Sequence, residues 1–140
     1  MQVFIIGSPL ETAKALDNRR LNKQIIECKQ ILDALNGAKA WSNHPVVLQY
    51  KNHQNWLMQY TFILESYRNG NLSIANFVNQ LIGMIKPKFH TEEFFSQMKR
   101  RLYTKNPHHY SQWSYLGESQ ENWYFVDGVM RKYINGKRIE

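Results

Sequence analysis

The sequence predicts a mainly α-helical fold that ends in a small β-meander. Between residues 9 and 105, apolar side chains recur at the three-to-four-residue spacing that is typical of amphipathic helices. After residue 122, the hairpin dipeptides Asp127-Gly128 and Asn135-Gly136 separate three short runs rich in β-branched and aromatic residues. A length of 140 residues suits a compact single domain with a sizeable core.

One predicted helix organises the rest of the chain. It begins after Asp17, a good N-cap, and stops before Gly37, a residue type that favours the left-handed conformation found at helix ends. Its apolar stripe consists of Leu21, Ile25, Cys28, Leu32 and Leu35. One edge of that stripe carries Arg20, Lys23, Gln24 and Glu27. This polar edge fits either a solvated flank with i,i+3 and i,i+4 pairs or a functional surface beside the core.

Capping residues, helix breakers and periodicity predict the other elements. The stretch Ser8-Pro9-Leu10-Glu11 is typical of a helix start. Ser73 and Thr91 are candidate N-caps, and Pro87 ends a helix. In chain order we expect a buried strand or extended segment at 2–6, helices at 9–15, 45–50, 54–69, 74–85 and 91–105, and strands at 123–126, 129–134 and 137–139.

Composition narrows the class of protein. A formal charge of +7 favours a polyanionic partner, with nucleic acid the first candidate. The single cysteine, Cys28, excludes an internal disulfide and is expected to fill core space. The five histidines lack the spacing of a metal site, so we expect no metal. No apolar run reaches the length of a membrane span and no signal sequence is evident, so we expect a cytoplasmic protein without a membrane partner.

The densest basic cluster lies near the end of the last predicted helix. Lys99, Arg100 and Arg101 occupy its second half, and Lys105 follows at the end of the helix. A solvated helix C-terminus explains these cations as well as a phosphate-contacting surface does.

The tripeptide Asn43-His44-Pro45 predicts a rigid corner, because Pro45 suits the first turn of a helix. We expect this corner to face the polar edge of the organising helix. It contains either a capping asparagine beside a partly buried histidine, or a functional His44 that hydrogen-bonds the site and titrates between about pH 5.5 and 7.5.

Three motifs together resemble a known family. They are Leu16-Asp17-x-x-Arg20-Leu21-x-Lys23-Gln24-x-x-Glu27-x-Lys29-Gln30-Ile31-Leu32, Trp41-x-Asn43-His44-Pro45 and Glu65-x-x-Arg68-Asn69-Gly70. The family, prokaryotic and phage in distribution, is that of pyrimidine dimer DNA glycosylases, or endonuclease V-like proteins. The resemblance continues through Lys105-x-Pro107-x-x-Tyr110 and covers residues 1–113, so we divide the chain into an endonuclease V-like helical domain (1–113) and a C-terminal extension with β-hairpins (114–140) that packs on it.

The resemblance implies a helical bundle of the endonuclease V type that repairs DNA as a monomer without a metal or organic cofactor. In the characterised phage member, the N-terminal amine attacks the sugar and a helix-borne glutamate supports β-elimination. The matching groups here are the Met1 amine and Glu27, which imply a glycosylase with abasic-site lyase activity. Taken together, the motifs and the basic cluster give as candidate DNA-binding residues Arg20, Lys23, Gln24, Asn43, His44, Arg100, Arg101 and Lys105.

This sequence departs from the characterised enzyme at two positions around the glutamate. Arginines flank the carboxylate there, whereas Ile26 and Gln30 occupy the matching positions here. Two alternatives therefore remain beside the glycosylase. One is a nucleic-acid-binding phage or bacterial accessory protein without lyase chemistry, and the other is an enzyme that acts on a modified base or nucleotide. A phage-encoded protein would act in the host cytoplasm.

Overall fold

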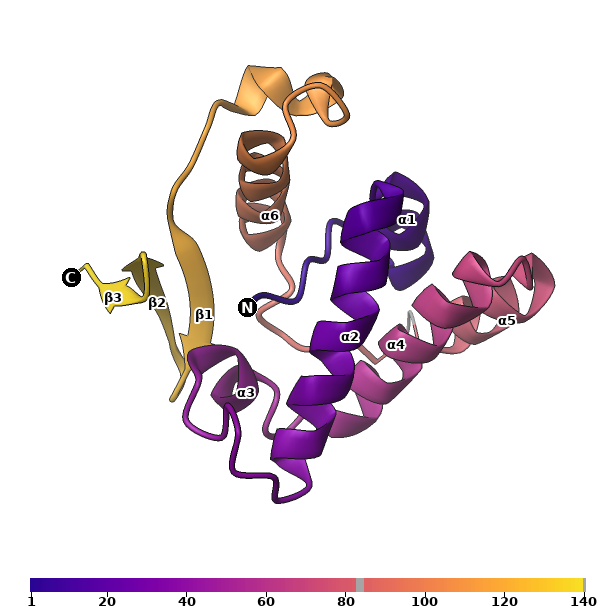
Figure 1. Cartoon of the computed structure of the whole chain (residues 1–140), viewed down its shortest axis with the longest axis horizontal. Helices are drawn as coiled ribbons and strands as arrows, with labels where there is room; N and C mark the ends of the chain where they lie inside the picture. The colour runs from indigo at the N-terminus through magenta and orange to yellow at the C-terminus, as the bar shows by residue number, and fades with distance from the viewer. Residues whose placement is uncertain (83–84, 140) are drawn as a thin grey trace.

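Helices form most of the molecule, and a small antiparallel sheet lies along one side of them (Figure 1). The structure is a computed structural model that describes residues 1–82 and 85–139. Its elements are α1 (Pro9–Ala15), α2 (Asn18–Leu35), α3 (Pro45–Gln49), α4 (Gln54–Arg68), α5 (Leu72–Ile82), α6 (Glu92–Lys105), a 3₁₀ helix η1 (Ser111–Leu116), β1 (Asn122–Val126), β2 (Val129–Ile134) and β3 (Lys137–Arg138). The predicted mainly α architecture with a terminal meander is confirmed.

Local sequence determines where several helices begin. The Ser8 side chain accepts a hydrogen bond from the Glu11 backbone N–H, and the Glu11 carboxylate accepts one from the Ser8 backbone, which completes a capping box. Asp17 caps α2 by accepting from the Arg20 N–H at 3.3 Å. Thr91 caps α6 in the same way. The caps predicted for these three helices are therefore confirmed.

The structure differs from the sequence prediction along α5 and in the core of α2. Because α5 begins at Leu72, Ser73 lies within its first turn and is not its N-cap. The apolar side chains of α5 do not share one environment, since Ile82 is buried while Phe77 is 62% exposed. In α2, Ile31 is fully buried and Leu32 only partly, so the core stripe lies slightly to one side of the predicted one. Residues 83–84 of the predicted 74–85 helix lie outside the described residues.

The two hairpin turns form as predicted. Asp127 and Gly128 have φ angles of 54° and 78°, and Asn135 and Gly136 have 49° and 79°. Two successive left-handed residues are the signature of the type I′ turn, whose twist matches that of the flanking strands. The register follows, with Val126 opposite Val129 and Ile134 opposite Lys137. The 3₁₀ helix η1, by contrast, was not predicted.

The N-terminal residues form an extended segment that is held by side chains. The Gln24 amide oxygen accepts from the Phe4 N–H at 2.7 Å, and its nitrogen donates to the Gln2 carbonyl at 2.9 Å. The Tyr60 hydroxyl donates to the Phe4 carbonyl. A side-chain amide offers both a donor and an acceptor, so Gln24 satisfies this backbone as a neighbouring strand would.

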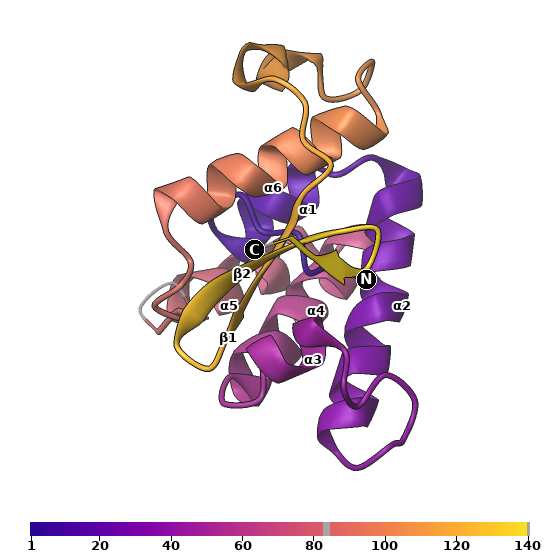
Figure 2. The same ribbon diagram turned by 90° about the vertical axis from the view of Figure 1, so that its left-hand side faces the viewer.

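Strand β1 joins the end of the chain to the helices. The Phe125 N–H donates to the Gln49 side chain of α3 at 2.7 Å, and Arg101 of α6 donates to the Asn122 side chain at 2.9 Å. The N-terminus consequently lies among α2, α6 and β1, where segments far apart in sequence meet (Figures 1 and 2).

We predict that Gln24→Leu destabilises the protein strongly, because it leaves the Phe4 N–H and the Gln2 carbonyl buried without partners. Each such group costs about 1–3 kcal/mol. The free energy of unfolding, measured by urea denaturation, should fall by about 2–5 kcal/mol. Gln30→Leu, at an exposed position of the same helix, is the matched control. A loss no larger than that of the control would contradict the proposed role of Gln24.

Candidate active site and nucleic-acid interface

A small cavity of about 80 Å³ surrounds the N-terminal residue. It is lined from three directions, by the extended N-terminal segment, by α2, and by α6 together with the start of β1. Its lining residues are Met1, Gln2, Phe4, Arg20, Lys23, Glu27, Arg101, Lys105 and Asn122. The structure thus brings Met1 beside Glu27, the two residues that the resemblance matches to the amine and the carboxylate of a lyase.

Glu27 is a buried carboxylate with incomplete hydrogen bonding. The residue is 8% exposed, and its Oε1 lies 3.5 Å from the Arg20 guanidinium. That oxygen has no hydrogen-bond partner among the described residues. Arg20 is itself held over the Phe4 ring, 5.2 Å from its centroid. A buried, under-bonded carboxylate is costly for stability, which makes Glu27 a candidate functional residue of this cavity.

The Met1 amine is partly buried among charged side chains of both signs. Desolvation lowers its pKa below the ordinary 8.0, and the cations Lys105, Lys23 and Arg20 lower it further, while the Glu27 carboxylate raises it. The net direction is downward. A larger fraction of the amine is therefore neutral near pH 7, which is the form that attacks an electrophilic carbon.

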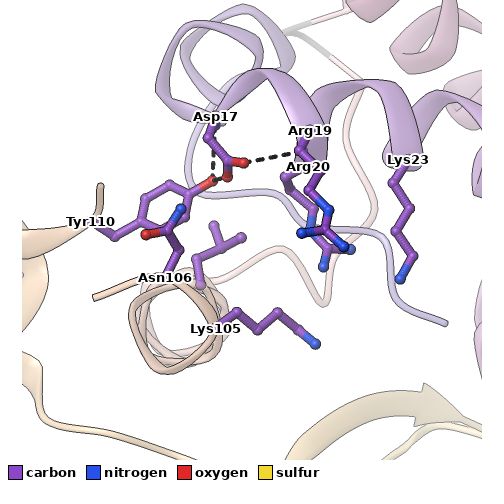
Figure 3. Close-up of a pocket in the computed structure, with 8 residues that line it drawn as sticks. Asp17, Arg19, Arg20, Lys23, Lys105, Asn106 and Tyr110 are labelled. Carbon is purple, nitrogen blue, oxygen red and sulfur yellow. Dashed lines mark hydrogen bonds between the residues drawn. The ribbon is translucent and has the colours of Figure 1, made fainter. Parts of the chain in front are cut away.

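A second, larger cavity of about 300 Å³ shares Arg20, Lys23 and Lys105 with the first (Figure 3). Its full lining is Asp17, Arg19, Arg20, Lys23, Leu102, Lys105, Asn106 and Tyr110. In Figure 3, Arg20 and Lys23 on α2 and Lys105 on α6 extend into the space between the two helices. Cations on two facing helices form a site suited to an anion such as phosphate.

The lowered pKa of Lys105 reflects burial and the crowding of these cations. Desolvation, followed by repulsion from Arg101, Arg20 and Lys23, lowers the pKa of Lys105 to about 8. The Glu27 carboxylate opposes part of this shift, while the Asp17 carboxylate of the larger cavity caps α2 and accepts a hydrogen bond from the Tyr110 hydroxyl. A bound anion would relieve the repulsion, so the free protein favours anion binding here.

The other candidate DNA-binding residues lie in different environments. Gln24 is fully buried and bonds the backbone of the N-terminal segment, so its side chain does not reach a surface where DNA binds. Arg101 lines the small cavity, but its guanidinium also bonds the Asn122 side chain and the Ser119 carbonyl, each at 2.9 Å. Arg100 lies outside the lining of both cavities, and Asn43 is exposed in the loop before α3.

His44 occupies the corner that its neighbour Pro45 predicted. Its Nδ1 accepts from the Val46 N–H at 3.1 Å, so the histidine caps α3, and the expected capping by asparagine is wrong. The ring meets the Tyr124 ring edge-on at 5.6 Å. Desolvation, and then the charge of the Met1 amine, lower the pKa of His44 to about 4. The expected titration between about pH 5.5 and 7.5 therefore does not fit this environment.

Several residues that shape the site were not predicted from the sequence. Arg19 and Asn106 line the larger cavity, while Asn122 lines the smaller one. Arg19 could have been predicted because it adjoins Arg20, and Asn106 because it lies within the Lys105-to-Tyr110 motif. No local feature of the sequence could have predicted Asn122, because nothing in the C-terminal stretch indicates that it lies near the first residue of the chain.

The comparison with protein families bears directly on this site. A family model described as pyrimidine dimer DNA glycosylase matches residues 1–65. The family resemblance is confirmed over this segment. It contains Met1, Glu27 and the corner at His44, and it ends before α6 and β1, so the resemblance expected up to residue 113 is matched only in its first part. Neither the curated proteins nor the solved structures include a match to this chain.

None of the described helices combines the length and apolar character needed to cross a bilayer. Within residues 1–82 and 85–139, no group of three or more histidine, cysteine or acidic side chains is arranged to hold a metal ion. Cys28 is buried, and desolvation raises the pKa of its thiol to about 12.

We predict that His44 contributes to the pH dependence of stability. Its pKa is about 4 in the folded protein and near 6.5 when unfolded, so folding favours the neutral ring. This contribution is complete above about pH 6.5 and is lost as the pH falls toward 4. His44→Gln should therefore flatten the decline of the unfolding free energy in that window. His90, whose pKa is lowered to about 3, retains part of the slope.

The measurement is urea denaturation at several pH values between 4 and 7, with His108→Gln at an exposed position as the control. An NMR titration of the His44 ring should show a midpoint near 4. A midpoint near 6.5, together with an unchanged slope in His44→Gln, would contradict the buried-corner interpretation.

Proposed function

We propose that this protein is a DNA-repair glycosylase with associated abasic-site lyase activity, in which the Met1 amine is the nucleophile and Glu27 is the catalytic carboxylate. One observation carries the proposal: Met1 and Glu27 line the same small cavity, beneath Arg20, Lys23 and Lys105. The family match over residues 1–65 supports the glycosylase class and a DNA substrate.

The first step breaks the bond between sugar and base. The neutral Met1 amine attacks C1′ of the deoxyribose, the N-glycosidic bond breaks, and the base leaves with a proton. The proton on the departing base comes from solvent. The amine nitrogen loses a proton, which passes to O4′ as the C1′–O4′ bond opens, and an iminium ion is left between Met1 and the sugar. The Glu27 carboxylate stabilises the positive charge that develops during this step.

The second step cleaves the strand. The iminium ion acidifies the C2′ hydrogen, Glu27 or a water that it orients accepts that proton, and the C3′–O bond breaks with the phosphate as leaving group. Hydrolysis of the iminium then releases the sugar aldehyde and restores the amine. No oxidant, reductant or metal enters this balance.

The cation cluster supplies the contacts to DNA in this proposal. Arg20, Lys23 and Lys105 extend into the larger cavity from two helices, where phosphates flanking the target nucleotide would bind. The characterised enzyme carries arginines at the positions of Ile26 and Gln30, and Ile26 is 57% exposed here. Arg19 and the cations of α6 supply the positive charge in this chain instead.

An exposed aromatic residue lies close to the His44 corner. Trp41 is 50% exposed, has a φ of 66°, and meets the His44 ring edge-on at 6.0 Å. A strained backbone at an exposed aromatic residue is consistent with a functional position. In the proposed enzyme, Trp41 stacks on a base exposed when the target nucleotide leaves the helix.

Borohydride trapping on DNA containing an abasic site tests the chemistry. The wild-type protein should form a covalent adduct through Met1, identified by mass spectrometry of the N-terminal peptide. Extending the chain by residues ahead of Met1 should abolish trapping while DNA affinity is retained, since the amine is displaced from the cavity. Wild-type protein that binds abasic DNA without forming an adduct would favour a binding protein without lyase chemistry.

We predict that Glu27→Gln lowers lyase turnover by at least about 100-fold, because an amide does not accept the proton or stabilise the cation as a carboxylate does. DNA affinity should be equal or slightly higher, since a negative charge near the phosphates is lost. Strand-cleavage kinetics and fluorescence anisotropy on one preparation give both quantities. A lower melting temperature with full turnover would instead assign Glu27 a purely structural ion pair with Arg20.

We predict that Lys23→Gln reduces the magnitude of the log–log salt slope of duplex binding by about 0.9, the value for one lost phosphate contact. Lys29→Gln is the matched control on the same helix, because Lys29 is paired with Glu65 at 2.9 Å and lines neither cavity. Equal slopes for the two variants would remove Lys23 from the DNA interface.

A further inference from the structure

Strand β1 lies outside the segment that matches the glycosylase family, yet it contacts the first two residues of the chain. The Tyr124 hydroxyl donates a hydrogen bond to the Met1 carbonyl at 2.8 Å. The Gln2 side chain donates to the Trp123 carbonyl at 3.1 Å. Both bonds join residues more than 120 positions apart in the sequence. The segment bearing the amine is therefore held by the C-terminal part of the chain as well as by α2.

The Tyr124 side chain is well suited to hold a fixed position. It is 3% exposed, and its ring packs edge-on against two others, His44 at 5.6 Å and Tyr133 at 5.4 Å. The flanking residues of β1 are fixed as well, since Asn122 bonds Arg101 and the Phe125 N–H bonds Gln49. A hydroxyl on such a rigid support restricts the carbonyl it binds more than one on a mobile side chain.

We infer that Tyr124 is a positioning residue for the Met1 amine, and that β1, through Tyr124, restricts the amine to the cavity that contains Glu27. Gln24, on α2, holds the following segment through the Gln2 carbonyl and the Phe4 N–H. Met1 is thus fixed both through its own carbonyl and through its neighbours. The amine itself stays available for reaction, because these bonds use the carbonyl and not the nitrogen.

The expected effect of Tyr124 on reaction rate rests on the proposed function, whereas its effect on the position of the amine does not. A misplacement of about 1 Å in a reacting group costs on the order of 100-fold in rate. Loss of the Tyr124 hydroxyl should also let the amine reach water more often, which weakens the desolvation that lowers its pKa. The charged and titratable groups that face the amine are Arg20, Lys23 and Glu27 on α2, His44 at the start of α3, Arg101 and Lys105 on α6, and Tyr124 on β1.

The decisive comparison is Tyr124→Phe against Tyr133→Phe. Each variant removes one hydroxyl from the same aromatic pair, and only that of Tyr124 bonds the N-terminal segment in the described structure. Single-turnover trapping on abasic DNA should slow by on the order of tenfold to 100-fold in Tyr124→Phe, with unchanged DNA affinity. The rising limb of its pH–rate profile should move to higher pH. Tyr133→Phe should match the wild type in both respects.

A measurement without DNA separates this inference from the proposed function. Reductive methylation with ¹³C-formaldehyde labels the Met1 amine, and NMR titration then gives its pKa in wild-type and variant proteins. Tyr124→Phe should raise that pKa toward the value of an exposed amine, and Gln2→Leu should shift it in the same direction. Wild-type protein that forms no adduct overturns the lyase proposal alone. An amine pKa in Tyr124→Phe equal to that of Tyr133→Phe overturns the positioning role.

Discussion

The two hydrogen bonds of the Gln24 side chain to the backbone of Gln2 and Phe4 are the constraint on which the site depends. They let a single extended segment lie in the core without a partner strand, because one amide satisfies both a donor and an acceptor of that segment. The apolar side chains of Val3 and Ile5 then anchor the segment in the core. The position of the Met1 amine is therefore determined, because Met1 lies at the end of a fixed segment.

The electrostatics of the site are unfavourable in the absence of an anion. Burial lowers the pKa of Lys105 and of the Met1 amine, positive side chains from α2 and α6 lower both further, and Glu27 compensates for part of that charge. The arrangement costs stability in the free protein and favours both anion binding and a neutral amine. In the proposed enzyme, this positive field would serve both the binding of DNA phosphates and the nucleophilicity of the amine.

Helix boundaries and turns could be predicted because they depend on neighbours in sequence. The Ser8 capping box, the Asp17 cap and the paired left-handed residues of both hairpins are properties of four or five consecutive residues. Errors occurred where tertiary packing selected one of two apolar faces. In α5, for example, Ile82 is buried and Phe77 is exposed, although both are apolar residues of the same helix. Periodicity identifies an apolar face, but it does not establish which neighbour covers that face.

By itself, the sequence determined the helical class, the terminal meander, the cation-rich edge of α2 and the likeness to a glycosylase family. Only the tertiary structure decided how these parts combine. Gln24 and Glu27 both lie on the predicted polar edge, yet one bonds the backbone and the other lines the cavity at the amine, because residues three apart on a helix still differ by about 60° in direction. The bond between Tyr124 and Met1 spans almost the whole chain, so no local pattern encodes it. Contacts of this length arise only when the whole core has folded.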